Sequence, residues 1–165
     1  MKNLYKSTAL KEINRLIWKL GTFKIRLLGF ISPKIISFSK ESMIVRVRLN
    51  RRTKNHLNSM YLGALVMGAE LAAGLPYAYF ATINKLKFSL VFASMESQYL
   101  KRPDSDVYFE VKDLSIFENL LNTSISDPNR HSLDVFVDAY TFYNEENKKE
   151  RVATFKLELS VKVKQ

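Results

Sequence analysis

The sequence predicts an α+β domain in which a curved antiparallel sheet wraps around one apolar helix. The helix is indicated by the 24 residues from Met60 to Ile83, which hold a single group that is charged at neutral pH, Glu70. Segments with apolar residues at every second position lie before and after this run, as in half-buried strands. A helix that is apolar on all sides requires burial, and a sheet that curls around it provides that burial.

A membrane span is the alternative for the same run, because its length suffices to cross a bilayer. Two features oppose it. Glu70 and Pro76 lie inside the run, and a charged residue at the centre of a bilayer costs about 2.5 to 3.5 kcal/mol. A crossing would also put the strands before and after it on opposite sides of the membrane, where they share no sheet.

Residues 3–20 predict an additional amphipathic helix that ends at Gly21. Such a helix covers an apolar surface, either the domain's own core and sheet edge or, as the alternative, the surface of a membrane. We therefore divide the chain into an N-terminal amphipathic helical segment, residues 1–32, and a main domain, residues 33–165. The apolar residues of this helix recur at intervals of three and four: Leu10, Ile13, Leu16, Ile17 and Leu20.

The strands are predicted from alternating apolar and polar residues. Two of them, near the C-terminus, pair across a polar tip at residues 144–150, as in a hairpin. A short helix is predicted at residues 114–121 and a turn at residues 126–130, where Pro128 ends any helix. The predicted strand segments are residues 35–38, 43–49, 86–92, 107–112, 133–137 and 152–163.

The chain has a formal charge of +10 and contains no cysteine. The charge favours anionic partners, such as anionic lipid, an acidic carrier protein or a coenzyme thioester. The sequence has neither the aromatic and basic motif of an RNA-binding sheet nor zinc-finger spacing, so we expect no nucleic-acid partner. The N-terminal residues lack the continuous apolar core of a secretory signal, so the expected location is the cytoplasm.

The central helix has clear start and stop signals. Asn58 and Ser59 are good N-cap residues, and Gly74 with Pro76 predicts the end of the helix. Small residues recur along it every four positions and form a flat stripe that lets a strand approach closely. These residues are Ala64, Gly68 and Ala72.

Glu70 is the leading candidate for chemistry because no Lys or Arg lies within one helical turn of it. Three environments remain open: an ion pair formed on folding, an exposed position, or a cavity shared with water and substrate. In a cavity, desolvation would raise the pKa of the carboxyl and suit it to general-base catalysis. We expect Glu70 in a dry, enclosed cavity beside the amides that start its own helix.

The residues before this helix supply the second half of the candidate site. A helix N-terminus presents unpaired N–H groups that can polarise a carbonyl, and Gly63 lets a substrate approach them closely. Asn55, His56 and Asn58 are candidates to orient water or substrate, or else they are ordinary turn and cap residues.

The spacing of Asn55, Tyr61, Gly63 and Glu70 resembles the central-helix motif of hot-dog fold acyl thioesterases of the phenylacetate-degradation type. The amino-acid sequence of residues 55–74 is even more similar to a thioesterase-like family of unknown function with the same fold. Residues 97–111, with the step from Leu100 to Pro103, and residues 153–162 are also similar to segments of that family. The likeness covers about residues 35–163.

The resemblance implies an activity and a set of roles. Glu70 acts as base or nucleophile in the hydrolysis of an acyl thioester, the Gly63 amide polarises the carbonyl, and Asn55 helps to place water. It also implies a homodimer or a dimer of dimers with active sites at the subunit interface, so that Glu70 faces the other chain. The enzyme needs no cofactor of its own, since coenzyme A or an acyl carrier protein is part of the substrate.

The chain departs from the family at Tyr61 and Leu62, where the family has His-Gly before the final Gly. Tyr is a poor base near neutral pH, and Leu62 narrows the approach to the helix amides. We assign Tyr61, Leu62, Asn58 and His56 to substrate binding, and keep a non-catalytic acyl- or lipid-binding protein as the alternative function. With two histidines and no HExxH or Gly-x-Ser-x-Gly motif, we expect no metal site and no serine nucleophile.

Overall fold

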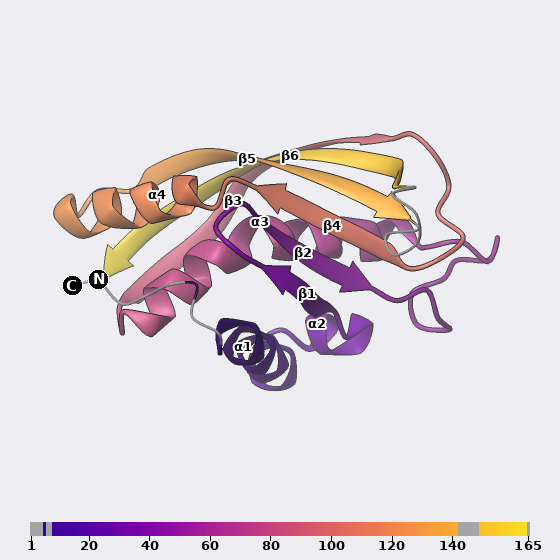
Figure 1. The fold of residues 1–165 in the computed structure, drawn as a ribbon, viewed down its shortest axis with the longest axis horizontal. Coiled ribbons are helices and arrows are strands. Elements are labelled where there is room, and N and C mark those ends of the chain that lie inside the picture. The colour runs from indigo at the N-terminus through magenta and orange to yellow at the C-terminus, as the bar shows by residue number, and fades with distance from the viewer. Residues whose placement is uncertain (1–4, 6–7, 142–148, 165) are drawn as a thin grey trace.

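The computed structural model describes residues 5, 8–141 and 149–164. It is an α+β fold in which pairs of strands follow one another along the chain with helices before and between them (Figure 1). Their bounds are α1 (Ala9–Phe23), α2 (Arg26–Ile31), β1 (Lys34–Phe38), β2 (Ser42–Val47), α3 (Leu62–Ile83), β3 (Lys87–Tyr99), β4 (Val107–Lys112), α4 (Ser115–Ser126), β5 (His131–Thr141) and β6 (Glu150–Lys164).

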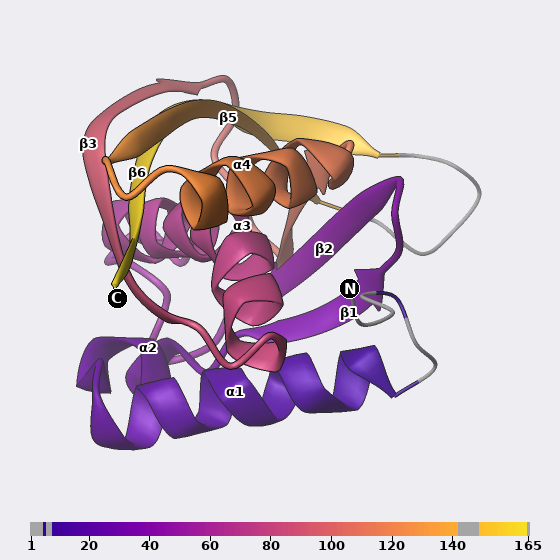
Figure 2. The same cartoon turned by 90° about the vertical axis from the view of Figure 1, so that its left-hand side faces the viewer.

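One six-stranded sheet runs in the order β1-β2-β4-β5-β6-β3, with every neighbouring pair antiparallel. The sheet curves around α3, and α1 and α2 lie against the side that the sheet leaves open (Figure 2). The long β3 stands at one end of the strand order and β1 at the other. The predicted curved sheet around a central helix is therefore confirmed.

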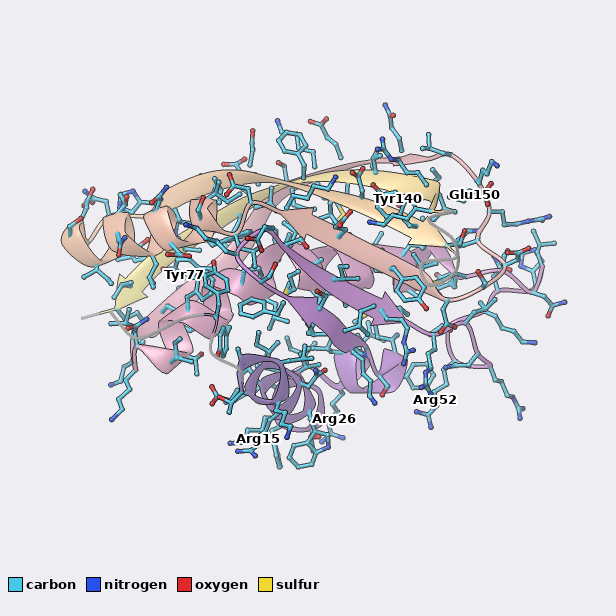
Figure 3. The ribbon with its side chains drawn as sticks, viewed as in Figure 1. Arg15, Arg26, Arg52, Tyr77, Tyr140 and Glu150 are labelled. Carbon is cyan, nitrogen blue, oxygen red and sulfur yellow. The ribbon has the colours of Figure 1, made fainter. Side chains whose placement is uncertain are left out.

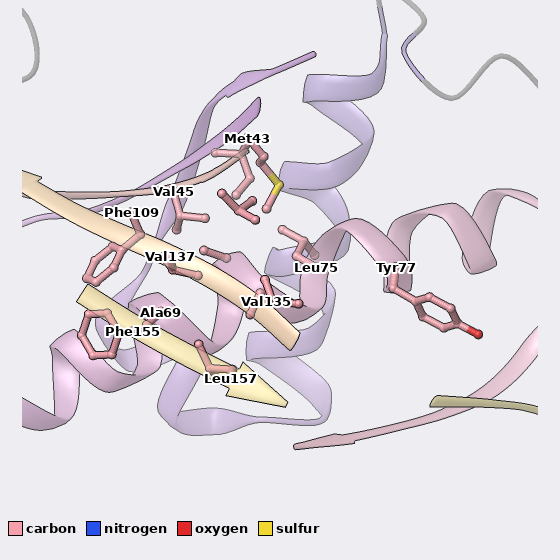
Figure 4. Close-up of a cluster of buried hydrophobic side chains, with 14 of the residues drawn as sticks. Met43, Val45, Ala69, Leu75, Tyr77, Phe109, Val135, Val137, Phe155 and Leu157 are labelled. Atoms are coloured by element: carbon pink, nitrogen blue, oxygen red, sulfur yellow. The ribbon is translucent and has the colours of Figure 1, made fainter. Parts of the chain in front are cut away.

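The core lies between the concave face of the sheet and α3. Opposed residues such as Val45 and Phe109, or Val137 and Phe155, pair in register and direct apolar side chains inward (Figure 4). The predicted small-residue stripe has the expected use, because a Cβ placed on Gly68 would lie 2.3 Å from the ring of Phe109. The stripe thus lets β4 approach the helix closely.

The prediction that α3 stops at Gly74 and Pro76 is wrong, since the helix continues to Ile83. Pro76 removes one backbone hydrogen bond, at a cost of about 3 kcal/mol. The turns beyond it bury Tyr77, Tyr79 and Phe80 almost completely, and a side chain of this size gains about 1.5 to 3 kcal/mol on burial. Burial of three rings therefore outweighs the proline.

By length and composition, α3 also meets the requirement for a membrane span. In this fold, 72% of its most apolar window is buried inside the molecule, as expected for the core helix around which a sheet closes.

The N-terminal segment folds as two helices rather than one. The expected end at Gly21 is wrong, because α1 continues to Phe23 and is followed by α2, which was not predicted. A Cβ on Gly21 would lie 2.8 Å from Gly29, so Gly21 permits a close crossing of the two helices instead of ending the first. Residues 3, 4, 6 and 7 of the expected helix lie outside the described residues.

The C-terminal half follows the prediction more closely. The strands β5 and β6 pair as expected, although residues 144–148 of the predicted hairpin tip lie outside the described part of the chain. Helix α4 extends to Ser126, five residues beyond the predicted end. Its polar last turns are satisfied locally, because Ser124 and Ser126 donate to carbonyls of their own helix.

Candidate functional site

Glu70 lies in the third turn of α3 and borders a cavity of about 120 Å³. The walls come from three elements: the α1–α2 segment, α3 and β3. The side chains that line it are otherwise apolar and include Leu20, Ile25, Leu28, Met67, Leu90 and Phe92.

Of the three environments left open by the sequence, Glu70 occupies a cavity and does not form an ion pair among the described residues. Within the described residues its carboxylate makes no hydrogen bond or ion pair. Desolvation by the apolar surroundings raises the pKa of this carboxyl. The residue is nevertheless exposed in the single chain. The expectation of an enclosed cavity is therefore wrong, and Glu70 lies at the open edge of a shallow one.

The start of α3 differs from the predicted cap. The N-cap is Tyr61, in an extended conformation, and neither Asn58 nor Ser59 caps the helix. The Tyr61 carbonyl accepts hydrogen bonds from the amides of Ala64 and Leu65, at 2.9 and 3.2 Å. The two preceding amides, of Leu62 and Gly63, have no acceptor within the helix. They remain the N–H groups that a ligand can use.

The loop before α3 is fixed by backbone hydrogen bonds, which explains why the helix starts later than the expected caps Asn58 and Ser59. Tyr61 donates its amide to the Thr53 carbonyl at 2.7 Å, and Met60 donates to the Pro103 carbonyl at 2.9 Å. These bonds hold residues 60 and 61 in extended geometry, so the helix cannot begin at the favourable cap residues Asn58 and Ser59.

The ring of Tyr61 covers the glycine that was expected to open the backbone to a substrate. A Cβ placed on Gly63 would lie 2.7 Å from Cε1 of Tyr61. Because the Tyr61 side chain is exposed, it can rotate away without loss of core packing.

The predicted polar residues are mostly engaged in the loop. The Oδ1 of Asn55 accepts hydrogen bonds from the amides of Leu57 and Ser59, which leaves its Nδ2 as the group available to a ligand. Asn58 has a left-handed backbone, with φ at 58°, and its Oδ1 accepts from the ammonium of Lys54. His56 is exposed to solvent.

The candidate residues do not share one cavity. His56, Asn58, Tyr61 and Gly63 line neither of the two cavities that the other candidates line. Asn55 and Leu62 line a cavity of about 320 Å³ at the start of α3, together with Lys101 and Arg102. Glu70 belongs to the other. Seven residues separate Gly63 from Glu70, which corresponds to about 10 Å along a helix axis. Glu70 also lines a different cavity from the residues at the helix start, so the expectation that Glu70 lies beside the amides of its own helix is wrong.

Sequence reasoning missed the contribution of the N-terminal segment to the Glu70 cavity. Leu20, Ile25 and Leu28 form one wall of it. The apolar periodicity of residues 10–20 indicated that this helix covers a surface, but nothing in it indicated which one. Among the described residues, no group of three His, Asp or Glu side chains is arranged to hold a metal ion.

The edge strand β3 lies beside the Glu70 cavity, and among the described strands it pairs on one side only. It is 13 residues long, and β6 is its partner in the sheet. Most of its side chains are exposed or half-buried, including Val91. A long edge of this kind offers unpaired backbone groups to a further strand.

Comparisons with known proteins agree with this architecture. The protein of unknown function from Chlorobaculum tepidum superposes with a TM-score of 0.78 at 11% identity, covering 94% of this chain and 97% of that one. A thioesterase from Haemophilus influenzae superposes with a TM-score of 0.66 at 16% identity, covering 94% of this chain and 92% of that one. A thioesterase family protein from Silicibacter pomeroyi superposes with a TM-score of 0.65 at 11% identity, covering 94% of this chain and 99% of that one. At such identities the likeness shows the fold.

No curated protein matches the chain. The model of a family described as Domain of unknown function (DUF4442) matches residues 14–161, a range that begins within α1 and ends in β6. The chain therefore belongs to the DUF4442 family, and its fold is the hot-dog fold of thioesterase family proteins.

Proposed function

We propose that this protein hydrolyses acyl thioesters. The observation that carries the proposal is Glu70, a carboxylate without a partner among the described residues, at the edge of an otherwise apolar cavity. The cavity suits the start of an acyl chain, and a carboxylate with a raised pKa is a better base near neutral pH than an ordinary one. The thioesterase-like fold supports the same reaction class.

In the proposed reaction Glu70 accepts a proton from water, and the water oxygen attacks the thioester carbonyl. The C–S bond then breaks, and the thiolate leaves with a proton to give a free thiol and a carboxylic acid. In a variant of this scheme Glu70 itself attacks and forms an anhydride that water hydrolyses. The amide of Gly63 donates to the carbonyl oxygen as negative charge develops there, and the Nδ2 of Asn55 orients the water.

The site is completed by a second chain. About 10 Å separates the Gly63 amide from Glu70 along one helix, so we assign the Glu70 of one chain to the Gly63 and Asn55 of the other. The free edge of β3 is the proposed dimer contact, because it runs beside the Glu70 cavity and has unpaired backbone groups. Two such dimers pairing further would give the dimer of dimers.

Substrate binding is assigned to the loop and first turn before the Gly63 amide. Tyr61 and Leu62 are exposed apolar side chains there, and they would contact the acyl group, while His56 and Asn58 would contact the carrier. The positive charge of the chain favours both proposed carriers, coenzyme A with its phosphates and an acidic acyl carrier protein. No further cofactor enters the scheme.

The test is release of free thiol from a panel of acyl-coenzyme A substrates of different chain length, with wild type and Glu70→Gln. Loss of general-base catalysis lowers the rate by about 10² to 10⁴. Glu41→Gln is the matched control, because it neutralises an exposed carboxylate in the β1–β2 turn and should leave the rate unchanged. Equal rates for wild type and Glu70→Gln would remove Glu70 from the mechanism.

The second candidate function is acyl binding without turnover. The observation that favours it is the Tyr61 ring, which lies against Gly63, where the family resemblance implies an open approach to the backbone. Mass spectrometry of the native protein would then reveal a co-purified acyl ligand, and the wild-type protein would release no thiol from any substrate of the panel. Thiol release by wild type would exclude this alternative.

A further inference from the structure

The outer face of the α1–α2 segment carries an unusual set of exposed apolar side chains. Trp18 is 62% exposed and Phe23 is 71% exposed, with their ring centroids 6.2 Å apart. Six consecutive residues, 22–27, are all exposed and alternate between apolar and basic side chains from Phe23 onward. We call this set the outer apolar patch: Trp18, Phe23, Ile25, Leu27 and Phe30.

The patch is not a by-product of loose packing. The inner faces of both helices are buried, with Ile13, Ile17 and Leu28 in the core. Asn14 ties α1 to β1 through two hydrogen bonds with the backbone of Ile35, at 2.9 and 3.0 Å. The segment is therefore held in place by its inner face, and the side chains of the patch are largely exposed to water.

Positive charge is concentrated around the patch. From the start of α1, residues 9–69 contain twelve Lys and Arg and two acids, Glu12 and Glu41, whereas residues 70–165 contain twelve Lys and Arg and fourteen acids. Figure 3 shows Arg15, Arg26 and Arg52 along the same lower side of the molecule, from α1, α2 and the loop after β2. The asymmetry gives this side a field that attracts anions.

A basic cavity adjoins the patch. Its volume is about 400 Å³, and the guanidinium of Arg52 lies 5.6 Å from the centre of the Phe30 ring at its rim. The Nε of Arg46 is buried in its wall, 4.0 Å from the carboxylate of Asp106, and has no hydrogen-bond partner among the described residues. Five cationic side chains and one ring line it: Phe30, Lys34, Arg46, Arg48, Arg51 and Arg52.

We propose that this face binds the surface of an anionic phospholipid membrane. The outer apolar patch would enter the interfacial region, where Trp and other aromatic side chains are favoured, and the basic cavity would take lipid phosphate groups. A second copy of the chain fits the face poorly, because symmetric contact would bring the same cationic side chains together. The proposal does not depend on thioester hydrolysis.

The position of the patch also gives it a route to the candidate site. Ile25 is both an exposed member of the patch and a wall residue of the Glu70 cavity. The apolar surface is thus continuous from the membrane-facing side to the cavity, which suits substrates whose acyl chains partition into lipid.

The chain contains its own reporter, because Trp18 is its single tryptophan. Emission of the wild-type protein should shift to shorter wavelength with vesicles of phosphatidylcholine and phosphatidylglycerol in equal amounts, and stay constant with phosphatidylcholine alone. Vesicle flotation should show the same preference and weaken with added salt. Unchanged emission with anionic vesicles, or equal flotation on both kinds, would overturn the proposal.

Variants locate the contact. Trp18→Ser with Phe23→Ser, and separately Arg26→Gln with Arg52→Gln, should weaken flotation, the latter by about fivefold for each cation. The matched controls are Phe136→Ser, an exposed ring on β5, and Lys162→Gln with Lys164→Gln on β6; both should float like wild type. Equal losses in the controls, or an emission shift that follows protein concentration without vesicles, would contradict the assignment to lipid.

Discussion

The two cavities along α3 differ in the functional groups that line them, since the carboxylate lines one and polar residues near the helix start line the other. The one beside Glu70 is small, apolar and supplied with a single carboxylate. The one at the start of the helix holds Asn55 and Leu62 with the cations Lys101 and Arg102, but none of the described residues that line it is acidic. Neither contains both a base and the free amides. This difference is the reason why the proposed hydrolysis combines the Glu70 cavity of one chain with the helix start of another.

The largest effect is expected from breaking the contact that would join the two cavities. Val91→Lys with Ala93→Lys puts charges on the exposed side of β3, where lysine opposes edge-to-edge pairing. The protein should become a folded monomer and lose thiol release almost completely. Phe136→Lys, on the exposed face of β5, is the control and should remain a dimer. Light scattering gives the mass, and an active monomer would contradict the dimeric site.

Two of the three glycines of α3, Gly63 and Gly68, should differ in their effect on stability. In Gly68→Ala the new Cβ meets the buried ring of Phe109 at 2.3 Å, whereas in Gly63→Ala it meets the movable ring of Tyr61. We expect Gly68→Ala to lower the free energy of unfolding by about 1 to 3 kcal/mol and Gly63→Ala to leave it nearly unchanged. Urea denaturation measures both, and equal losses would refute the distinction.

A smaller effect concerns access to the helix amides. Tyr61→Ala removes the ring that covers Gly63, so kcat should rise by about threefold to tenfold, the gain of one better-formed hydrogen bond. Phe136→Ala serves as the comparison for loss of an exposed ring. A fall in kcat for Tyr61→Ala would mean that the ring itself contacts the reacting group.

The smallest effect is a pH dependence of stability at Glu70. Burial raises the pKa of this carboxyl in the folded state, so the folded chain binds more protons than the unfolded one and its stability falls as pH rises past the ordinary carboxyl range. Glu70→Gln should remove this fall. At low pH the free energy of unfolding of the variant should equal that of wild type, and near neutral pH it should be slightly higher. The gain is small because the residue is exposed. Denaturant titrations across that range measure it; a benefit that is largest at low pH would contradict the sign.

The fold was accessible from the sequence because its strongest signals are local. Period-two strands and a 24-residue apolar run between them leave few ways to bury α3. The isolation of Glu70 could likewise be read from its neighbours. The errors at Ser59, Gly74 and Gly21 share one cause, since each was assigned from local propensity and each was decided by contacts distant in sequence. The contribution of Ile25 and Leu28 to the wall of the Glu70 cavity could not be predicted for the same reason.

Subunit mixing tests the shared site most directly. Glu70→Gln removes the base from one chain and Gly63→Val blocks the amide of the other, so each homodimer should be inactive. In heterodimers isolated through two different tags, one site regains an intact Glu70 and an intact Gly63, and the rate of thiol release should return to about half that of wild type. Heterodimers as inactive as the two parents, although folded and dimeric, would show that base and amide act within one chain and would contradict the account.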